Sequence, residues 1–178
     1  MSTDPGRETN DEDRFAGWVR EHGRAVRGFL AAMLRRTDLV DELSQEVFCR
    51  AWEARSRYRE QGTARAYLLR IADRLVCDRI RRLPAALNLD EAGWKQHEPW
   101  SDGEDPADAL QQAEEGKQLA AALDRLSDPQ RRVLLLRYYG QFTFAEIAAI
   151  TGCPLNTTLS HCHRGLETLR KLLVEQCP

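Results

Sequence analysis

The chain has 178 residues, enough for one or two small domains, and 42% of them are hydrophobic, which excludes a wholly disordered protein. Its 26 Lys and Arg residues and 28 Asp and Glu residues give a formal net charge of −2, an average that argues against a nucleic-acid-binding protein. No apolar run reaches the length of a membrane span and no secretory signal pattern opens the chain, so we expect a cytoplasmic protein.

The net charge conceals an uneven distribution along the chain. Residues 1–12 carry −3, residues 13–83 carry +6, residues 84–116 carry −8 and residues 117–178 carry +3. Two basic blocks therefore flank one strongly acidic segment. The basic blocks retain the electrostatic character that nucleic-acid binding needs, and the acidic segment masks it in the average.

Three amphipathic helices are predicted in the first half of the chain. Apolar residues recur at helical spacing over 13–36, over about 38–56 and over about 64–83, whereas the alternation typical of strands is absent. We therefore expect an all-α protein in which residues 13–83 form a compact helical domain. The polar segment 1–12 is predicted to be a disordered tail.

The character of the sequence changes over residues 84–109. Proline, glycine and acidic residues are frequent here, and a segment of this length is too long for a connection inside one compact domain. We predict a flexible acidic linker over 84–109, a second helical domain over 110–173 and a short tail over 174–178.

Capping signals in the second domain indicate a helix-turn-helix. Ser127–Gln130 has the form of a capping box and opens a helix that is expected to stop at Gly140. Thr143–Glu146 is another capping box, and the short helix that it opens is closed by Gly152. Asn156 is the expected N-cap of the last helix, about 157–173. In this motif the second helix lies in the major groove of DNA, and its N-terminal residues contact base edges.

The predicted second helix of the motif carries seven candidate DNA contacts and few cations. The candidates are Asn156, Thr157, Thr158, Ser160, His161, His163 and Arg164. The side chains expected to close the core of this domain are Ile147, Ala148, Leu155, Leu159 and Leu166. An ordinary helical hairpin remains the alternative, because the first two turns contain no Lys or Arg.

Two helices of the first domain offer further interaction surfaces. Six arginines surround the apolar stripe of 64–83 and suit phosphate contacts, although two carboxylates among them are also typical of a solvated face. The segment 41–52 mixes carboxylates, an amide and large apolar side chains, a composition that favours a protein–protein interface.

Catalytic and metal-binding chemistry is disfavoured. His161, Cys162 and His163 are adjacent and project about 100° apart on a helix, so they cannot hold one ion together. The chain contains no glycine-rich phosphate loop and no arrangement of a nucleophile with a base. We therefore predict no cofactor, no metal, no small-molecule substrate and no enzymatic activity.

Three motifs in order resemble RNA polymerase sigma factors of the extracytoplasmic-function (ECF) group. Asp41–Trp52 is close to the sequence DLVQEVFLRAW of that family, and Ala66–Ala72 is similar to AWLYRIA. Leu126–Leu134 is the third motif. The resemblance covers residues of about 13–83, which it implies to be sigma region 2, and about 110–173, which it implies to be region 4.

The resemblance implies two contact sets in the first domain. The helix of 41–52 would bind the clamp helices of core RNA polymerase through Asp41, Glu42, Ser44, Gln45, Glu46, Phe48 and Arg50. The loop before the third helix and that helix itself would face the minus-ten promoter element, where a base leaves the stack as the duplex opens. The residues of this second set are Tyr58, Arg59, Arg65, Tyr67, Arg70 and Arg74.

In the second domain, the resemblance implies that the last helix reads the minus-thirty-five element and lays its apolar side on the polymerase flap. An anti-sigma factor is a further expected partner, and a membrane is not. The family commonly has Lys and Arg where this chain has Leu159 and His161, which would weaken phosphate contacts. Two alternatives therefore stay open: a stand-alone helix-turn-helix regulator, and a sigma-like adaptor that binds other proteins.

Overall fold

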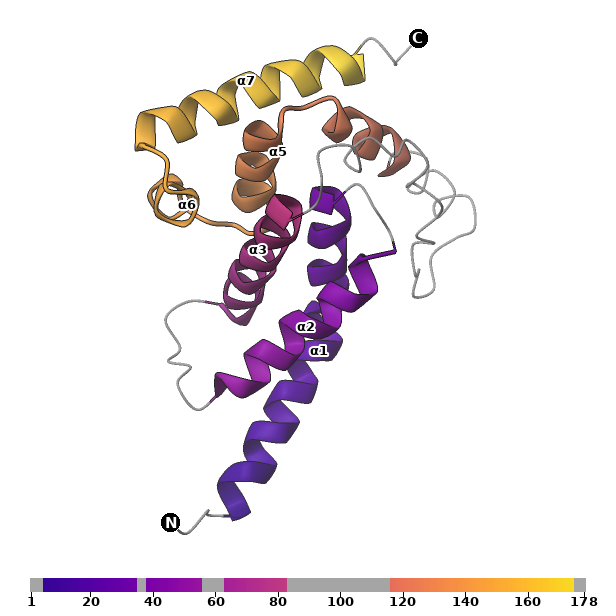
Figure 1. Ribbon diagram of the computed structural model, residues 1–178, viewed down its shortest axis with the longest axis vertical. Helices are drawn as coiled ribbons and strands as arrows, with labels where there is room; N and C mark the ends of the chain where they lie inside the picture. The colour runs from indigo at the N-terminus through magenta and orange to yellow at the C-terminus, as the bar shows by residue number, and fades with distance from the viewer. Residues whose placement is uncertain (1–4, 35–37, 56–62, 83–115, 175–178) are drawn as a thin grey trace. The chain divides into compact units, whose positions relative to one another are not determined.

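The computed structural model describes residues 5–34, 38–55, 63–82 and 116–174. Within these ranges every regular element is a helix and none is a strand, so the all-α prediction is confirmed there (Figure 1). The chain divides into two compact units, Met1–Asp90 and Glu91–Pro178. In the described part of the chain, no helix is long and apolar enough to cross a membrane.

The first unit is a bundle of three helices, each of which packs against the other two: α1 (Pro5–Leu34), α2 (Val40–Glu53) and α3 (Ala64–Arg82). Burial of apolar side chains at this meeting point provides the main stabilisation of the unit. The largest fully buried side chains in it are Phe29, Leu30, Leu68, Leu69, Val26, Val40, Val47 and Val76.

The first helix begins earlier than its sequence periodicity predicts. It starts at Pro5 rather than near residue 13, and so extends into the segment 1–12 that is predicted to be a tail. Proline favours this start because the first turn of a helix leaves its N–H groups without partners, and proline has no N–H to lose.

The second unit contains the helical residues 116–124, α5 (Asp128–Leu134), the π-helical turn η3 (Leu135–Tyr139), α6 (Phe144–Thr151) and α7 (Leu155–Val174). The helix α7 packs against α5 and α6. The predicted acidic linker, 84–109, lies outside the described residues.

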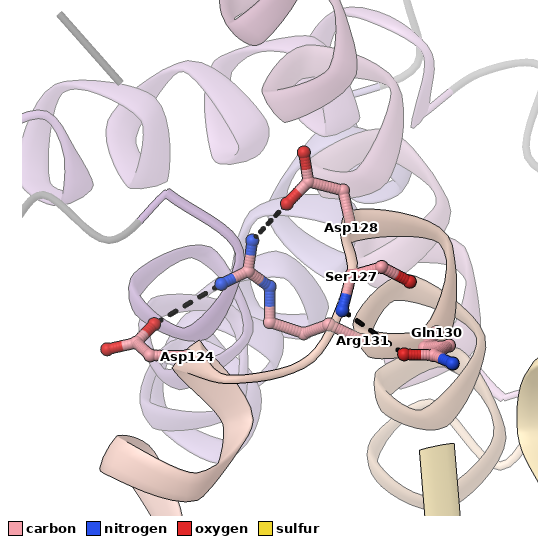
Figure 2. Close-up of polar contacts among 5 residues, drawn as sticks. All are labelled: Asp124, Ser127, Asp128, Gln130 and Arg131. Carbon is pink, nitrogen blue, oxygen red and sulfur yellow. Dashed lines mark hydrogen bonds and ion pairs between the residues drawn. The ribbon is translucent and has the colours of Figure 1, made fainter. Parts of the chain in front are cut away.

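A buried arginine fixes the turn into α5. The side chain of Arg131 is only 3% exposed, and its Nη1 and Nη2 lie 3.2 Å from Asp124 Oδ1 and 2.7 Å from Asp128 Oδ1 (Figure 2). The Gln130 side chain accepts a hydrogen bond from the Ser127 backbone N–H at 3.2 Å, as the predicted capping box requires. The sequence of this turn thus brings the end of one helix against the start of the next.

The last turn of the α5–η3 segment is wider than an α-helix. The Gly140 N–H donates to the Leu135 carbonyl at 2.9 Å, and the Phe142 N–H donates to the Leu136 carbonyl at 3.1 Å. The helix therefore ends near Gly140, as predicted, but in a π turn. A Cβ at position 140 would lie 2.7 Å from the ring of the fully buried Phe142, so only glycine fits there.

The caps of the helix-turn-helix are largely those predicted. The Thr143 N–H donates to Glu146 Oε2 at 2.8 Å and the Glu146 N–H donates to Thr143 Oγ1 at 3.3 Å, which confirms this capping box. Gly152 closes α6 in the left-handed conformation, with φ of 71°. The prediction for Asn156 is wrong, because α7 starts at Leu155 and Asn156 lies inside its first turn.

The buried face of α7 differs from the predicted one. Thr158, Cys162 and Gly165 are buried, whereas Leu155, Leu159 and Leu166 are 47%, 41% and 41% exposed, so the prediction that these leucines close the core is wrong. The reason is close packing against α5, where a Cβ at position 165 would lie 2.8 Å from Leu134 Cδ1. Large side chains of α5 fill the core, and the small residues of α7 face them.

Candidate polymerase and nucleic-acid interfaces

The helix α2 separates its predicted polymerase contacts into an exposed row and one buried residue. Asp41, Glu42, Gln45 and Arg50 are exposed, and Glu46 and Phe48 are half-buried. Ser44 is 6% exposed and lies on the buried face with Val40, Leu43, Val47 and Ala51. Ser44 therefore lies apart from the exposed members of the predicted contact set, because positions three and four residues from the buried valines face the core.

Ion pairs to both neighbouring helices hold the first turn of α2. Asp41 pairs with Arg27 of α1, and both carboxylate oxygens of Glu42 lie 3.2 Å from Nη2 of Arg79 in α3. Exposed pairs of this kind add little to the free energy of folding. They do restrict the orientation of the two carboxylates, and so give this end of α2 a defined polar surface.

One turn further along, the pair is internal to α2. Arg50 Nη2 lies 2.6 Å from Glu46 Oε1, four residues earlier on the same helix. Glu46 and Arg50 thus continue the polar row that begins with Asp41 and Glu42. All charged side chains of this row are exposed or half-buried.

Five aromatic residues from all three helices lie together at the other end of α2. The Phe15 ring is 5.1 Å from Trp52, 6.3 Å from Phe48 and 6.2 Å from Trp18, and Trp18 is 6.2 Å from Tyr67. All five side chains are half-buried, and burial raises the pKa of Tyr67. Phe48, predicted as a polymerase contact, therefore packs within this aromatic cluster.

Phe15 and Trp18 belong to no predicted contact set, and Trp52 was predicted only as part of the interface segment 41–52. The Arg55 guanidinium lies 3.8 Å above the Trp52 ring, and that of Arg14 lies 5.8 Å from Trp18. The signal available in the sequence was the spacing of aromatic residues along the first and second helices. This spacing does not reveal the cluster by itself, because the aromatic residues meet only when the helices pack together.

The structure brings together part of the predicted minus-ten set. Tyr58 and Arg59 lie outside the described residues. Tyr67, Arg70 and Arg74 share one face of α3 at helical spacing, and both arginines are exposed. Arg65 is half-buried and lies on the other side of the helix, because two residues correspond to about 200° of rotation.

The candidate DNA contacts of α7 are mostly exposed, with one exception. Asn156, Thr157, Ser160, His163 and Arg164 are exposed, and His161 is half-buried. Thr158, also predicted as a base contact, is fully buried, and its hydroxyl donates to the Pro154 carbonyl at 3.2 Å. Cys162 follows one turn later on the same buried face, and burial raises the pKa of its thiol.

Two of the exposed α7 side chains have partners on their own helix. The Ser160 hydroxyl donates to the Asn156 carbonyl at 2.9 Å, and His163 Nδ1 lies 3.6 Å from Glu167 Oε2.

Among the residues with described positions, no three His, Cys, Asp or Glu side chains form a group that could hold a metal ion.

Comparison with protein families matches both units. Residues 18–84 match the family model Sigma-70 region 2, and residues 116–169 match Sigma-70, region 4. The two matches follow the order that the motifs predict. The first covers α2 and α3, and the second covers the helix-turn-helix.

Curated relatives match across both regions. The chain is 31% identical over 165 residues to the ECF RNA polymerase sigma factor SigK of Mycolicibacterium vanbaalenii, which covers 92% of this chain and 83% of that protein. It is 30% identical over 169 residues to the ECF RNA polymerase sigma factor SigW of Bacillus subtilis, over 92% of this chain and 90% of that one.

Solved structures share the fold. The sigma factor RpoE in complex with the anti-sigma factor NepR from Bartonella quintana matches with a TM-score of 0.68 and 20% identity, over 92% of this chain and 98% of that chain. CnrH in complex with the cytosolic domain of CnrY matches with a TM-score of 0.58 and 22% identity, over 93% and 90%.

Proposed function

The chain belongs to the ECF sigma factors of RNA polymerase, and we propose that it binds core polymerase, recognises a promoter and helps to open it. The observation that supports this most directly is the polar row of α2, which stands in the motif Asp41–Trp52 and is oriented by ion pairs to α1 and α3. Such a surface suits a protein partner better than a small molecule.

We assign the polymerase contact to the exposed part of that row. Asp41, Glu42, Gln45, Glu46 and Arg50 would meet the clamp helices of the largest subunit. The ion pairs preorganise the carboxylates, so less side-chain entropy is lost on binding. Phe48 would contribute indirectly, through its edge-on contact with Phe15.

We assign promoter opening to the face of α3 that carries Tyr67, Arg70 and Arg74, with Tyr58 and Arg59 of the preceding loop. Arginines neutralise phosphates along one strand, and an aromatic ring offers a surface for an unstacked base. Taking a base out of the duplex costs a few kcal/mol, which such contacts offset. Arg65, on the opposite side of α3, is the weakest member of the set.

In the second unit, α7 would enter the major groove of the minus-thirty-five element. Asn156, Thr157, Ser160, His163 and Arg164 are available there, with His161 at the margin. The exposed apolar side chain at the end of α7, Val174, would contact the polymerase flap. The helix α7 would therefore have one face in the hydrophobic core of the second unit, one face for DNA and one for the polymerase.

The protein would act by binding alone, as an initiation factor and not as an enzyme, in the cytoplasm where polymerase works. An anti-sigma factor is a further proposed partner, because two solved structures that share the fold are complexes with a partner protein, and one of them joins a sigma factor to an anti-sigma factor. Neither alternative, the stand-alone regulator or the adaptor, is favoured by relatives that are named sigma factors.

Reconstituted transcription tests the proposal. Purified chain is added to core polymerase and a library of promoter-bearing templates, and the transcription starts are mapped. We expect a set of starts that requires the added chain. Binding to core without any dependent start would support the adaptor, and absence of core binding would contradict the sigma assignment.

A further inference from the structure

The start of α7 has no permanent positive charge. From Leu155 to His163 the helix contains no Lys or Arg, and its first is Arg164. In a helix-turn-helix, base edges are read by the N-terminal residues of the second helix. Any base contact that the first turns of α7 make in the major groove must therefore come from uncharged side chains or from histidine imidazoles.

The polar groups of these turns are fewer than the sequence suggests. Thr158 is buried, and its hydroxyl is bonded to the Pro154 carbonyl. The Ser160 hydroxyl donates its proton to the Asn156 carbonyl, so it offers only acceptor lone pairs to DNA. Asn156 and Thr157 are the exposed polar side chains that remain in the first turn.

Apolar side chains occupy the space beside them. Leu155 and Leu159 are 47% and 41% exposed, and a spacing of four residues places them together on one side of α7. They do not close the core, because Thr158, Cys162 and Gly165 provide the buried face. Asn156 lies three residues before Leu159, within reach of the same stretch of a groove.

One apolar group is available in the major groove, the C5-methyl group of thymine. We propose that Leu159, with Leu155 beside it, recognises thymine methyl groups in the upstream promoter element. This inference rests on the proposed function and deepens it by naming what α7 reads. Asn156 would complement the leucines, because an asparagine amide pairs with the N6 and N7 atoms of adenine, the partner of thymine.

Leu166 provides a matched control. It is as exposed as Leu159, at 41%, but lies seven residues further along α7, about 10 Å from it along the axis. Leu166 therefore lies beyond the N-terminal turns of α7, which are the turns that meet base edges. Truncation of Leu166 removes the same apolar group from the same helix without touching the proposed contact.

The test uses holoenzyme assembled from this chain and core polymerase. Promoter duplexes with a randomised upstream element are selected by binding, and the selected duplexes are then remade with deoxyuridine in place of each thymine. Deoxyuridine keeps base pairing and removes only the methyl group. We expect selected elements to contain thymine at fixed positions, and its replacement to weaken binding about fourfold for each contacted methyl group.

The variants connect this loss to the side chain. Leu159→Ala holoenzyme should bind thymine duplexes about fourfold more weakly and show no further loss when deoxyuridine replaces the thymine that Leu159 contacts. Leu166→Ala should retain the full difference between thymine and deoxyuridine. Leu159→Lys should bind DNA more tightly at low salt and lose the difference between thymine and deoxyuridine duplexes. This second variant keeps the test possible if Leu159→Ala does not bind DNA.

The outcomes separate this inference from the proposed function. Failure to form holoenzyme, or to select any element, contradicts the sigma assignment itself. A selected element that binds equally with thymine and deoxyuridine overturns the methyl contact alone. The contact is also overturned if Leu159→Ala keeps the difference at every thymine position, or if it loses polymerase binding while DNA recognition is unchanged, since Leu159 would then face the flap.

Discussion

The two surfaces that we propose for promoter DNA, one in each unit, differ in physical character. In the first unit, α3 exposes Arg70 and Arg74 one turn apart on the face that carries Tyr67, and further arginines follow at its end. In the second unit, the first turns of α7 expose leucine, asparagine and threonine. Arg131 of that unit, whose charged side chain is buried, serves a structural role in the turn before α5.

The difference indicates a division of work. Contacts between arginine and phosphate are strong, sensitive to salt and insensitive to sequence. Apolar and amide contacts to base edges are weaker, largely independent of salt and specific. The first unit would therefore provide most of the affinity for DNA, and the second would provide discrimination at the upstream element.

The largest effect is expected from reversing one charge on α2. Glu46→Arg removes the pair with Arg50 and places two like charges one turn apart on the proposed polymerase surface. We expect core binding to weaken about thirtyfold or more, the scale of an interface hot spot, with the fold intact. Binding of labelled chain to core polymerase measures the loss, and far-UV circular dichroism checks the fold.

The matched control is Glu21→Arg, the same reversal at an exposed position of α1. It should leave core binding unchanged. Equal losses for the two variants would mean that net charge, and not the α2 surface, governs binding.

A glycine-to-alanine substitution should have opposite signs in the two units. Gly140→Ala places a Cβ 2.7 Å from the Phe142 ring and 2.8 Å from the Leu136 carbonyl oxygen, and we expect it to destabilise the second unit by about 2 kcal/mol. Gly17→Ala in α1 meets no atom within 4 Å and should stabilise the first unit by up to about 1 kcal/mol.

Urea unfolding followed by circular dichroism compares the two glycine variants. If Gly140→Ala were as stable as the parent chain, the π turn and its close contact with Phe142 would not be the structure that the chain adopts.

The proposed division of work predicts different salt dependences. The double variant Arg70→Gln/Arg74→Gln removes two phosphate contacts, and the slope of log affinity against log salt should fall by about 1.4 for a single-stranded minus-ten probe. The same holoenzyme should keep its slope for a duplex that carries only the upstream element. Equal reductions on both probes would remove the distinction between the units.

The smallest effect is expected at the buried member of the α2 motif. Ser44→Ala should change core binding by less than about twofold, because Ser44 is 6% exposed and faces the core. Gln45→Ala, at the exposed neighbouring position, should weaken binding about fivefold or more. A larger loss for Ser44→Ala than for Gln45→Ala would contradict the assigned faces of α2.

Features governed by local chemistry were predictable from the sequence. The capping box at Thr143 and Glu146, the left-handed stop at Gly152 and the end of the helix near Gly140 each depend on a few adjacent residues. The polar row of α2 was predictable for the same reason, since its motif lies on one continuous helix.

Features that depend on packing between helices were not predictable in the same way. The face of α7 that is buried depends on the close approach of Gly165 to Leu134, and hydrophobicity alone pointed instead to Leu159 and Leu166. Ser44 entered the predicted contact set through the resemblance of the whole motif, which does not separate the exposed and buried faces of the helix, and it lies with valines on the buried face. The aromatic cluster joins residues from three helices, so no single segment reveals it.

Detection of unpaired thymines with permanganate tests promoter opening most directly. The reagent is applied to a selected promoter with core polymerase alone, with the chain alone and with both together. We expect reactive thymines at the minus-ten element only when both are present, with loss of this reactivity in the Glu46→Arg variant. Specific protection of the duplex by the chain alone, without any reactive thymine when polymerase is added, would contradict it.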